Sequence, residues 1–258
     1  MICREVNRDR IRKFCQRDPA RYAFYLGDLD DAEWENSHYF AKEVDGKIDE
    51  LMLIYLGLSL PSVQLFGRRG SLGQTCLEFI AQLPESFHLH CHDEDIPLLK
   101  ESLALAEGGE LFRMHWRGFP KKLRPRTTPS RILEAKDLPV LCEFLRLAFP
   151  SAFFEPHQLA KALFAGCFLG SNLIACAGFH VLSYGEGVGV LGSIATHPDH
   201  RGKGLATSAT HRLMEEVEGS IPLLALNVHV RNTPAVTLYR SLGFEDIFSY
   251  RETSAKRR

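Results

Sequence analysis

Two glycines alternate with two basic residues over positions 201–204. Glycines let a bulky phosphate approach the backbone, because no Cβ stands in the way. In residues 205–217 the apolar positions recur every four residues, which predicts an amphipathic helix that begins directly after the glycines. The free N–H groups of a first helical turn attract anions, and Arg201 and Lys203 add positive charge there. These residues predict a site for a phosphate group.

The segment before the glycines narrows the choice of ligand. Residues 188–195 are apolar and partly β-branched, which predicts a buried strand, and Pro198 ends its pairing because proline has no backbone donor. A nucleotide-binding Walker loop requires an earlier glycine and a Ser or Thr after Gly-Lys, whereas Gly204 stands at that place. A dinucleotide fingerprint requires a third glycine where Thr207 stands. Both classes of site are excluded.

A second motif follows the first in the chain and consists of Asn232, Ala235, Leu238, Tyr239, Gly243 and Phe244. The run Arg201-Gly-Lys-Gly-Leu-Ala206 also matches the pattern [Gln/Arg]-x-x-Gly-x-[Gly/Ala] at every fixed position. In both motifs, and in their order, the sequence resembles the GNAT superfamily of acyl-CoA-dependent N-acyltransferases. The resemblance covers residues 130–258, the length of one ordinary domain.

The resemblance implies where acetyl-CoA would bind. The strand before the glycines would separate from its neighbour, so that the main chain of Ile194, Ala195 and Thr196 pairs with the pantetheine arm. Asn232 would contact the cofactor from the start of the next helix. The pyrophosphate would lie against Arg201, Gly202, Lys203, Gly204, Leu205, Ala206 and Thr207.

The resemblance also implies the catalytic groups. Attack of an amine on the thioester expels a thiolate, whose conjugate acid has a pKa near that of cysteine, about 8.5. Tyr239 would protonate this thiolate as the general acid, and the N–H of Ile194 would stabilise the oxyanion. Outside this motif, a tyrosine at position 239 would be interpreted as an ordinary core residue.

The general base is less well defined. Many relatives carry a glutamate on one of the two central strands, and this chain has none there. We assign the role to Glu186 at the entrance of the 188–195 strand, with His180, His229 or a chain of waters as the alternatives. Asn227 stands where ribosomal-protein N-terminal acetyltransferases have a glutamate, which argues against peptide N-termini as the acceptor.

Composition excludes several classes of partner. The chain has 258 residues, a net charge of −1 and 45% hydrophobic residues, so it can form large cores but offers no electrostatic case for binding nucleic acid or membranes. It shows no membrane span or signal peptide, which predicts a cytoplasmic protein. The seven cysteines have no paired spacing and are interpreted as buried free thiols.

The cluster His88-Leu-His-Cys-His92 has two interpretations. On a strand, the three histidines would project from one face and offer a zinc site. The alternative, which we prefer, is that Leu89 and Cys91 point into the core while the histidines face solvent or another domain. No further ligand pair supports a metal, so we predict none.

The order of elements suggests a duplicated plan. A linker is predicted at 121–129, a catalytic domain at 130–258, and an N-terminal domain at 1–120 whose glycine segment, 68–73, departs from the signature. Helices are predicted at 8–14, 21–29, 74–82, 96–106, 136–149 and 155–165. The last three residues, Lys256 to Arg258, are interpreted as a solvated tail.

The whole chain therefore resembles tandem members of the superfamily, including glycine N-acyltransferase-like proteins, in which a degenerate N-terminal half supports an active C-terminal half. An unrelated α+β domain is the alternative for residues 1–120. The predicted fold is α+β with a mixed sheet. The predicted function is transfer of an acetyl group from acetyl-CoA to a primary amine of a small molecule, amino acid or peptide. A noncatalytic acyl-CoA sensor is the alternative.

Overall fold

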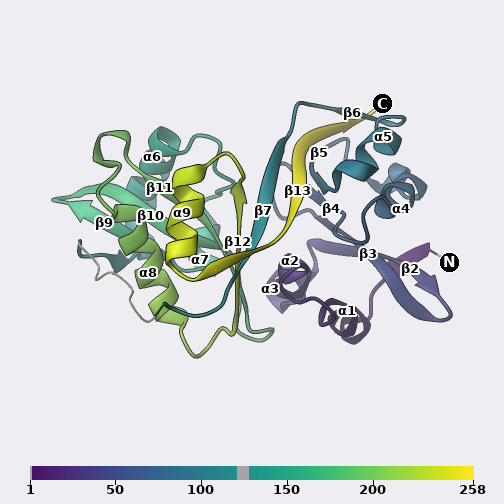
Figure 1. Cartoon of the computed structure of the whole chain (residues 1–258), viewed down its shortest axis with the longest axis horizontal. Coiled ribbons are helices and arrows are strands. Elements are labelled where there is room, and N and C mark those ends of the chain that lie inside the picture. The colour runs from purple at the N-terminus through teal and green to yellow at the C-terminus, as the bar shows by residue number, and fades with distance from the viewer. Residues whose placement is uncertain (1, 121–127) are drawn as a thin grey trace. The chain divides into compact units, whose positions relative to one another are not determined.

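The computed structural model describes residues 2–120 and 128–258, so most of the predicted linker lies outside the described residues. Packing divides the chain into two units (Figure 1). The first unit comprises Met1–Arg113, Val228–Asn232 and Asp246–Arg258, and the second comprises Met114–Asn227 and Thr233–Glu245. Neither unit is one continuous segment, since the end of the chain belongs with its beginning.

The second unit contains a mixed sheet in the order β12-β11-β10-β9-β8. Neighbouring strands are antiparallel, except for the parallel pair β11 and β12. The strands are β8 (Arg131–Ile132), β9 (Phe164–Leu169), β10 (Asn172–Ser183), β11 (Val188–Thr196) and β12 (Leu223–His229).

Helices of the second unit bury one apolar face each. In α6 (Leu138–Ala148) the buried residues Leu141, Phe144 and Leu145 have the spacing of one helical face and pack with Phe164 of β9. α8 (Leu205–Val217) packs against β9, β10 and β11 (Figure 1). The others are α7 (Gln158–Lys161), α9 (Thr233–Ser241) and the short 3₁₀ turns η3 (Ala135–Asp137) and η4 (Pro198–His200).

In the first unit, the strands β1 to β5 follow one another in the sheet and β5 pairs with β13. β4 and β5 are parallel, and the other pairs are antiparallel. The strands are β1 (Ile2–Glu5), β2 (Ser37–Val44), β3 (Lys47–Tyr55), β4 (Ser62–Gln64), β5 (Ser86–Cys91), β6 (Leu103–Leu105), β7 (Gly109–Trp116) and β13 (Phe244–Arg257).

Short helices cover this sheet. α1 (Arg8–Cys15) begins at Asn7, whose side chain accepts from the N–H groups of Asp9 and Arg10, and it buries Ile11 and Phe14. The others are α2 (Ala23–Gly27), α3 (Asp31–Trp34), α4 (Leu72–Glu78), α5 (Ile96–Leu99), η1 (Ile80–Gln82) and η2 (Asp93–Asp95). A core of the first unit is formed by apolar residues of β2 to β5 with α4, α5 and Ala255.

The two units repeat one order of elements. A strand, two or three helices, an antiparallel hairpin and a third antiparallel strand lead through a glycine segment to a helix and then to a parallel strand. In the first unit these are β1 to β5 with α4 after the glycines, and in the second β8 to β12 with α8. Both halves of the chain therefore have the same mixed α+β architecture.

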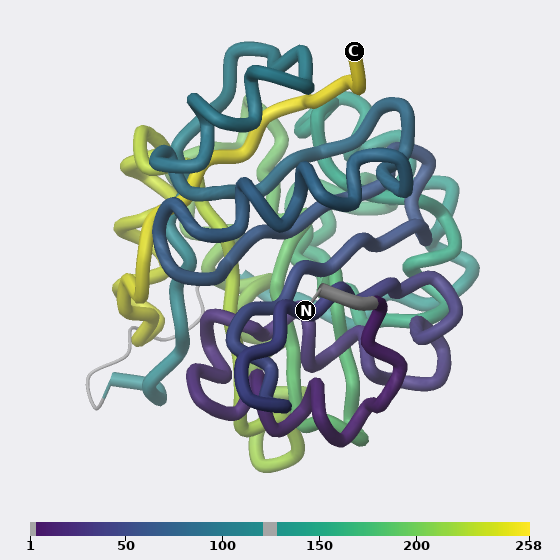
Figure 2. The backbone as a smooth tube through the Cα atoms, turned by 90° about the vertical axis from the view of Figure 1, so that its right-hand side faces the viewer, coloured from purple at the N-terminus to yellow at the C-terminus, as the bar shows by residue number. Residues whose placement is uncertain are grey.

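Three sequence predictions are wrong in detail. Residues 103–105 form β6 rather than the end of a helix, because they pair with Ala255–Arg257 of β13 (Figure 2). That pairing also places Lys256 and Arg257 in a strand instead of a solvated tail. The helix predicted at 155–165 is reduced to α7, because Phe164 and Ala165 pair with β10.

The cysteines are as predicted in the part of the chain for which side chains are described: six are free and five of these are buried. Among the described residues, no helix is long and apolar enough to cross a membrane.

Candidate active site

The parallel strands β11 and β12 separate part of the way along their length. Their pairing runs from Val188 with Leu223 to Leu191 with Leu226, although both strands continue beyond these residues. β11 keeps its other neighbour, since Ala195 and Thr196 still pair with β10. The separation begins just before Ile194, as the sequence predicted.

A strained residue lies at this separation. Ser193 has a φ of 50°, a left-handed conformation that is rare for residues other than glycine, and a bulge of β11 surrounds it. A second bulge, in β10, contains His180. The His180 Nε2 lies 3.3 Å from the Ser193 Oγ. Such strain is retained where the surrounding structure enforces it, which is frequent at functional sites.

Gly192 makes this pair possible. A Cβ at position 192 would lie 2.2 Å from ring atoms of His180, so that only glycine leaves room for the imidazole. Burial lowers the pKa of His180 from its usual 6.5 to about 4. The imidazole is therefore neutral near pH 7, and its unprotonated nitrogen can accept a proton.

The predicted phosphate segment, residues 201–207, has the expected backbone geometry. Gly202 and Gly204 have φ values of 75° and 72°, and Gly204 is the N-terminal cap of α8. No side chain caps this helix end, and nothing lies within 4 Å of where a Cβ of Gly202 would be. The N–H groups of the first turn lack intrahelical acceptors. Arg201 and Lys203 are exposed beside them.

Tyr239 lies in α9 and is 6% exposed. Its ring contacts Phe244, with the centroids 6.2 Å apart, and its hydroxyl has no hydrogen-bond partner among the described residues. Burial raises its pKa well above 10, so the phenol keeps its proton at neutral pH. Only a protonated phenol can act as a general acid.

The structure describes the local surroundings of the remaining predicted residues. Glu186 is in the turn between β10 and β11, where its N–H donates to the Ser183 Oγ at 3.1 Å. It precedes Ile194 by eight residues, which in an extended strand corresponds to roughly 25 Å. Asn232 and His229 are grouped with the first unit, whereas residues 201–207 are grouped with the second. The contact of Asn232 with the cofactor therefore stays a prediction.

The histidine cluster does not behave as expected. Leu89 and Cys91 are buried as predicted, but His90 and His92 are buried as well, at 7% and 2% exposure. The ring of His90 stacks on Tyr250, and the His92 Nε2 lies 3.2 Å from the Gly67 carbonyl oxygen. Burial lowers the pKa of His90 to about 3. Within residues 2–120 and 128–258, no group of His, Cys, Asp and Glu side chains is arranged to hold a metal.

Sequence reasoning missed Ser193 and Gly192 completely. A serine beside a glycine in an apolar strand carries no local signal of a bulge, because the conformation depends on the pairing with β10. The position of His180 opposite Ser193 depends on the same two bulges. His180 had been an alternative for the base, without a reason to prefer it.

Residues 126–244 match the family model described as the acetyltransferase (GNAT) family. The chain is also 37% identical over 101 residues to the mycothiol acetyltransferase of Thermobifida fusca (strain YX). This match covers 35% of the chain and 31% of that protein. The chain thus spans less than a third of that relative's length.

Solved structures resemble the whole chain in fold. A GCN5-related N-acetyltransferase from Sphaerobacter thermophilus aligns with a TM-score of 0.61 and 14% identity over 100% of this chain and 96% of that one. A tandem GNAT protein from the clavulanic acid biosynthesis pathway aligns with a TM-score of 0.58 and 13% identity, covering 99% and 98%. A Drosophila protein reaches 0.73 at 13% identity, covering 99% and 98%. At these identities the likeness concerns the fold alone.

Proposed function

Because residues 126–244 match the family model of the GNAT acetyltransferases, we propose that the chain transfers an acetyl group from acetyl-CoA to a primary amine. The acceptor would be a small molecule, an amino acid or a peptide, and the amine would attack directly in a complex of enzyme, acetyl-CoA and acceptor. The curated relative matches only over part of its length, so its named substrate does not identify the acceptor of this chain.

The observation that carries the proposal is the open start of α8. Gly204 caps the helix without a side-chain acceptor, and the first-turn N–H groups are left for a ligand. A pyrophosphate is a suitable ligand, because it accepts several hydrogen bonds and is attracted by the helix dipole and by Arg201 and Lys203. Gly202 adds open space over its own backbone.

The proposed chemistry is direct attack of an amine on the thioester of acetyl-CoA. The amine nitrogen attacks the thioester carbonyl, and the resulting oxyanion would be stabilised by the N–H of Ile194. The carbon–sulfur bond then breaks, and Tyr239 would give its proton to the departing thiolate. The amine loses one proton in the same reaction, so that the products are an amide and a free thiol.

We assign the proton acceptor to His180, with the Ser193 hydroxyl as the connecting group. The two are 3.3 Å apart, next to the residue whose N–H would stabilise the oxyanion. The proton would pass from the nitrogen to the Ser193 Oγ while the hydroxyl proton moves to the His180 Nε2. This assignment prefers His180 to Glu186, which lies in the turn before β11 and eight residues before Ile194 in the chain.

The base can be tested separately from the overall reaction. His180→Ala should lower kcat with little change in the KM for acetyl-CoA, and added imidazole should restore part of the rate. A histidine with a purely structural role would not be rescued by imidazole. Absence of rescue together with a loss of folded protein would contradict the assignment.

The function itself is tested by incubating the full chain with acetyl-CoA and a broad panel of amines and amino acids. Release of free thiol that depends on both partners supports an acetyltransferase and identifies the acceptor. Tight binding of acetyl-CoA without thiol release from any amine would favour the sensor.

A further inference from the structure

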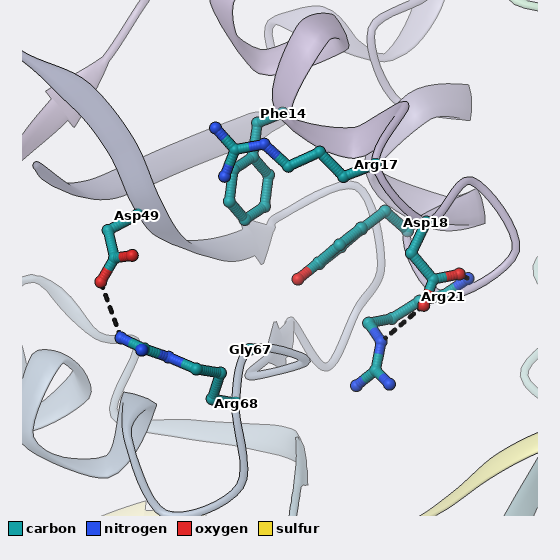
Figure 3. A pocket seen from close by; sticks show the side chains of 8 residues that line it. Phe14, Arg17, Asp18, Arg21, Asp49, Gly67 and Arg68 are labelled. Carbon is teal, nitrogen blue, oxygen red and sulfur yellow. Dashed lines mark hydrogen bonds and ion pairs between the residues drawn. The ribbon is translucent and has the colours of Figure 1, made fainter.

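The first unit contains a cavity of about 270 Å³, built from three parts of the chain (Figure 3). Phe14 comes from the end of α1, Arg17 and Tyr22 come from the segment between α1 and α2, and Asp49 comes from β3. Arg68 comes from the glycine segment after β4. The cavity is slightly smaller than the pockets that hold drug-sized ligands, about 300–1,000 Å³, which points to a small molecule.

Arginine side chains that line this cavity outnumber the aspartates that pair with them. The Arg21 Nε lies 3.0 Å from the Asp18 Oδ2, and the Arg68 Nη2 lies 2.8 Å from the Asp49 Oδ2. These four side chains line the cavity in two neutral pairs. Glu50, behind Arg68, is shared between the Arg68 Nε at 3.4 Å and the Lys42 Nζ at 3.8 Å.

Arg17 also lines the cavity, and its guanidinium belongs to neither of these two pairs. It forms no ion pair with a carboxylate among the described residues, and it lies over the ring of Phe14, 5.0 Å from the centroid. Figure 3 shows Arg17 and Arg68 on opposite sides of the space between them. The charged groups that face or adjoin the cavity therefore leave one positive charge without a partner.

The walls between the charges are largely aromatic. Phe14 is 4% exposed and Tyr22 is 7% exposed, so both rings are part of the folded core and cannot move away. The Tyr22 hydroxyl has no hydrogen-bond partner within residues 2–120 and 128–258. A phenol at the wall of a cavity can donate to an anion, and burial raises its pKa above 10, which keeps the proton in place.

We propose that this cavity is a second binding site of the protein, for a small molecule that carries a carboxylate or phosphate group. The anionic group would lie between Arg17 and Arg68, with the Tyr22 hydroxyl as a further donor. Guanidinium groups suit this role, because their planar donors match the oxygens of both anions. The site is independent of the acetyl-CoA site, which lies in the second unit.

Calorimetric titration of the full chain with inorganic phosphate and with malonate tests the proposal. Because phosphate could also bind at the start of α8, the titrations use a Gly204→Glu background, which blocks that helix end. Saturable binding of phosphate alone identifies a phosphorylated ligand, and binding of malonate alone identifies a carboxylate. Binding of neither anion at millimolar concentration would overturn the proposal.

One variant of a lining residue and one matched control locate the binding. Arg17→Met should weaken the affinity at least tenfold, which corresponds to about 1.4 kcal/mol. Lys13→Met is the matched control, since it removes the same charge from α1 without lining the cavity, and it should change the affinity little. Equal effects of the two substitutions would show general charge attraction and would overturn the site.

Asp49→Asn removes the carboxylate that competes for Arg68 and should tighten binding. Both Asp49 and Arg17 are at least partly exposed, so neither substitution is expected to unfold the protein. Weaker binding in Asp49→Asn would overturn the proposed role of Arg68.

Discussion

In both units a glycine segment lies at the same point of the topology, directly before a helix. The N–H groups at the start of that helix are open in one unit and closed by a carboxylate in the other. In the second unit, residues 201–207 leave the start of α8 open. In the first unit, residues 68–73 lead into α4, and the N–H of Gly73 donates to the Asp95 Oδ1 at 2.8 Å. A carboxylate of the chain itself thus occupies the start of α4.

Asp95 is well suited to close that helix end. It is 2% exposed, and the N–H groups of Gly73 and Gly70 stabilise its charge, although burial raises its pKa overall. A Cβ at Gly73 would lie 3.0 Å from the Asp95 Oδ1, so the carboxylate is in close contact with the helix backbone. The same topology therefore leaves the helix start open in one unit and closes it with an internal contact in the other.

The largest expected effect is on turnover, and it concerns Tyr239 in the second unit, where the helix start is open. Tyr239→Phe keeps the ring and removes only the hydroxyl, so turnover should fall by roughly 10²- to 10⁴-fold, the range of a lost general acid. The affinity for acetyl-CoA should change little. Steady-state kinetics with the identified acceptor, together with calorimetry, measure both values. A loss of affinity with turnover intact would indicate a structural tyrosine instead.

Gly204→Glu tests whether the open helix start holds the pyrophosphate. The new side chain would fill the phosphate space and repel it, so the affinity for acetyl-CoA should fall by more than tenfold, or about 1.4 kcal/mol. The wild type should bind one equivalent per chain, because the first copy is closed. Unchanged affinity in a folded variant, or two equivalents in the wild type, would refute the difference between the copies.

The contact of Asp95 with the start of α4 can be tested by measuring the free energy of unfolding. Asp95→Ala leaves the buried N–H of Gly73 without its acceptor, so the free energy of unfolding should fall by about 1–3 kcal/mol. Urea unfolding of the full chain measures this value. Glu94→Ala is the control, because Glu94 is an exposed neighbour that pairs with Arg69 at the surface and should contribute little to stability. Equal losses in the two variants would remove the special role of Asp95.

Local signals in the sequence predicted much of this arrangement. The spacing of apolar residues predicted α8 with the bounds 205–217 that the structure has, and the glycines predicted the turn before it. The helix predicted over 96–106 failed because Leu103–Leu105 pairs with the far end of the chain. Strand pairing over such a separation leaves no trace in a local pattern.

Contacts between distant segments also explain why parts of the candidate sites could not be predicted from the sequence. Asp95 meets Gly73 from 22 positions away, and Arg68 meets Asp49 from 19. The left-handed Ser193 depends on the bulge between β10 and β11. Residue types at fixed spacing can predict a motif, whereas a contact between two distant segments appears only after the chain has folded.

The smallest expected effect concerns the charge beside the open helix. Arg201 is exposed, so Arg201→Ala should weaken acetyl-CoA binding only severalfold, which is in the range of about 0.2–1 kcal/mol for an exposed ion pair. Salt screens exposed charges, with a Debye length of about 10 Å at 0.1 M, so the difference from the wild type should shrink as ionic strength rises. Calorimetric titrations at low and high salt measure this change. A loss that stays constant with salt would mean that Arg201 shapes the backbone of the segment instead of attracting the phosphate. Arg240→Ala in α9 removes the same charge outside the 201–207 segment and should leave the affinity nearly unchanged at either salt concentration.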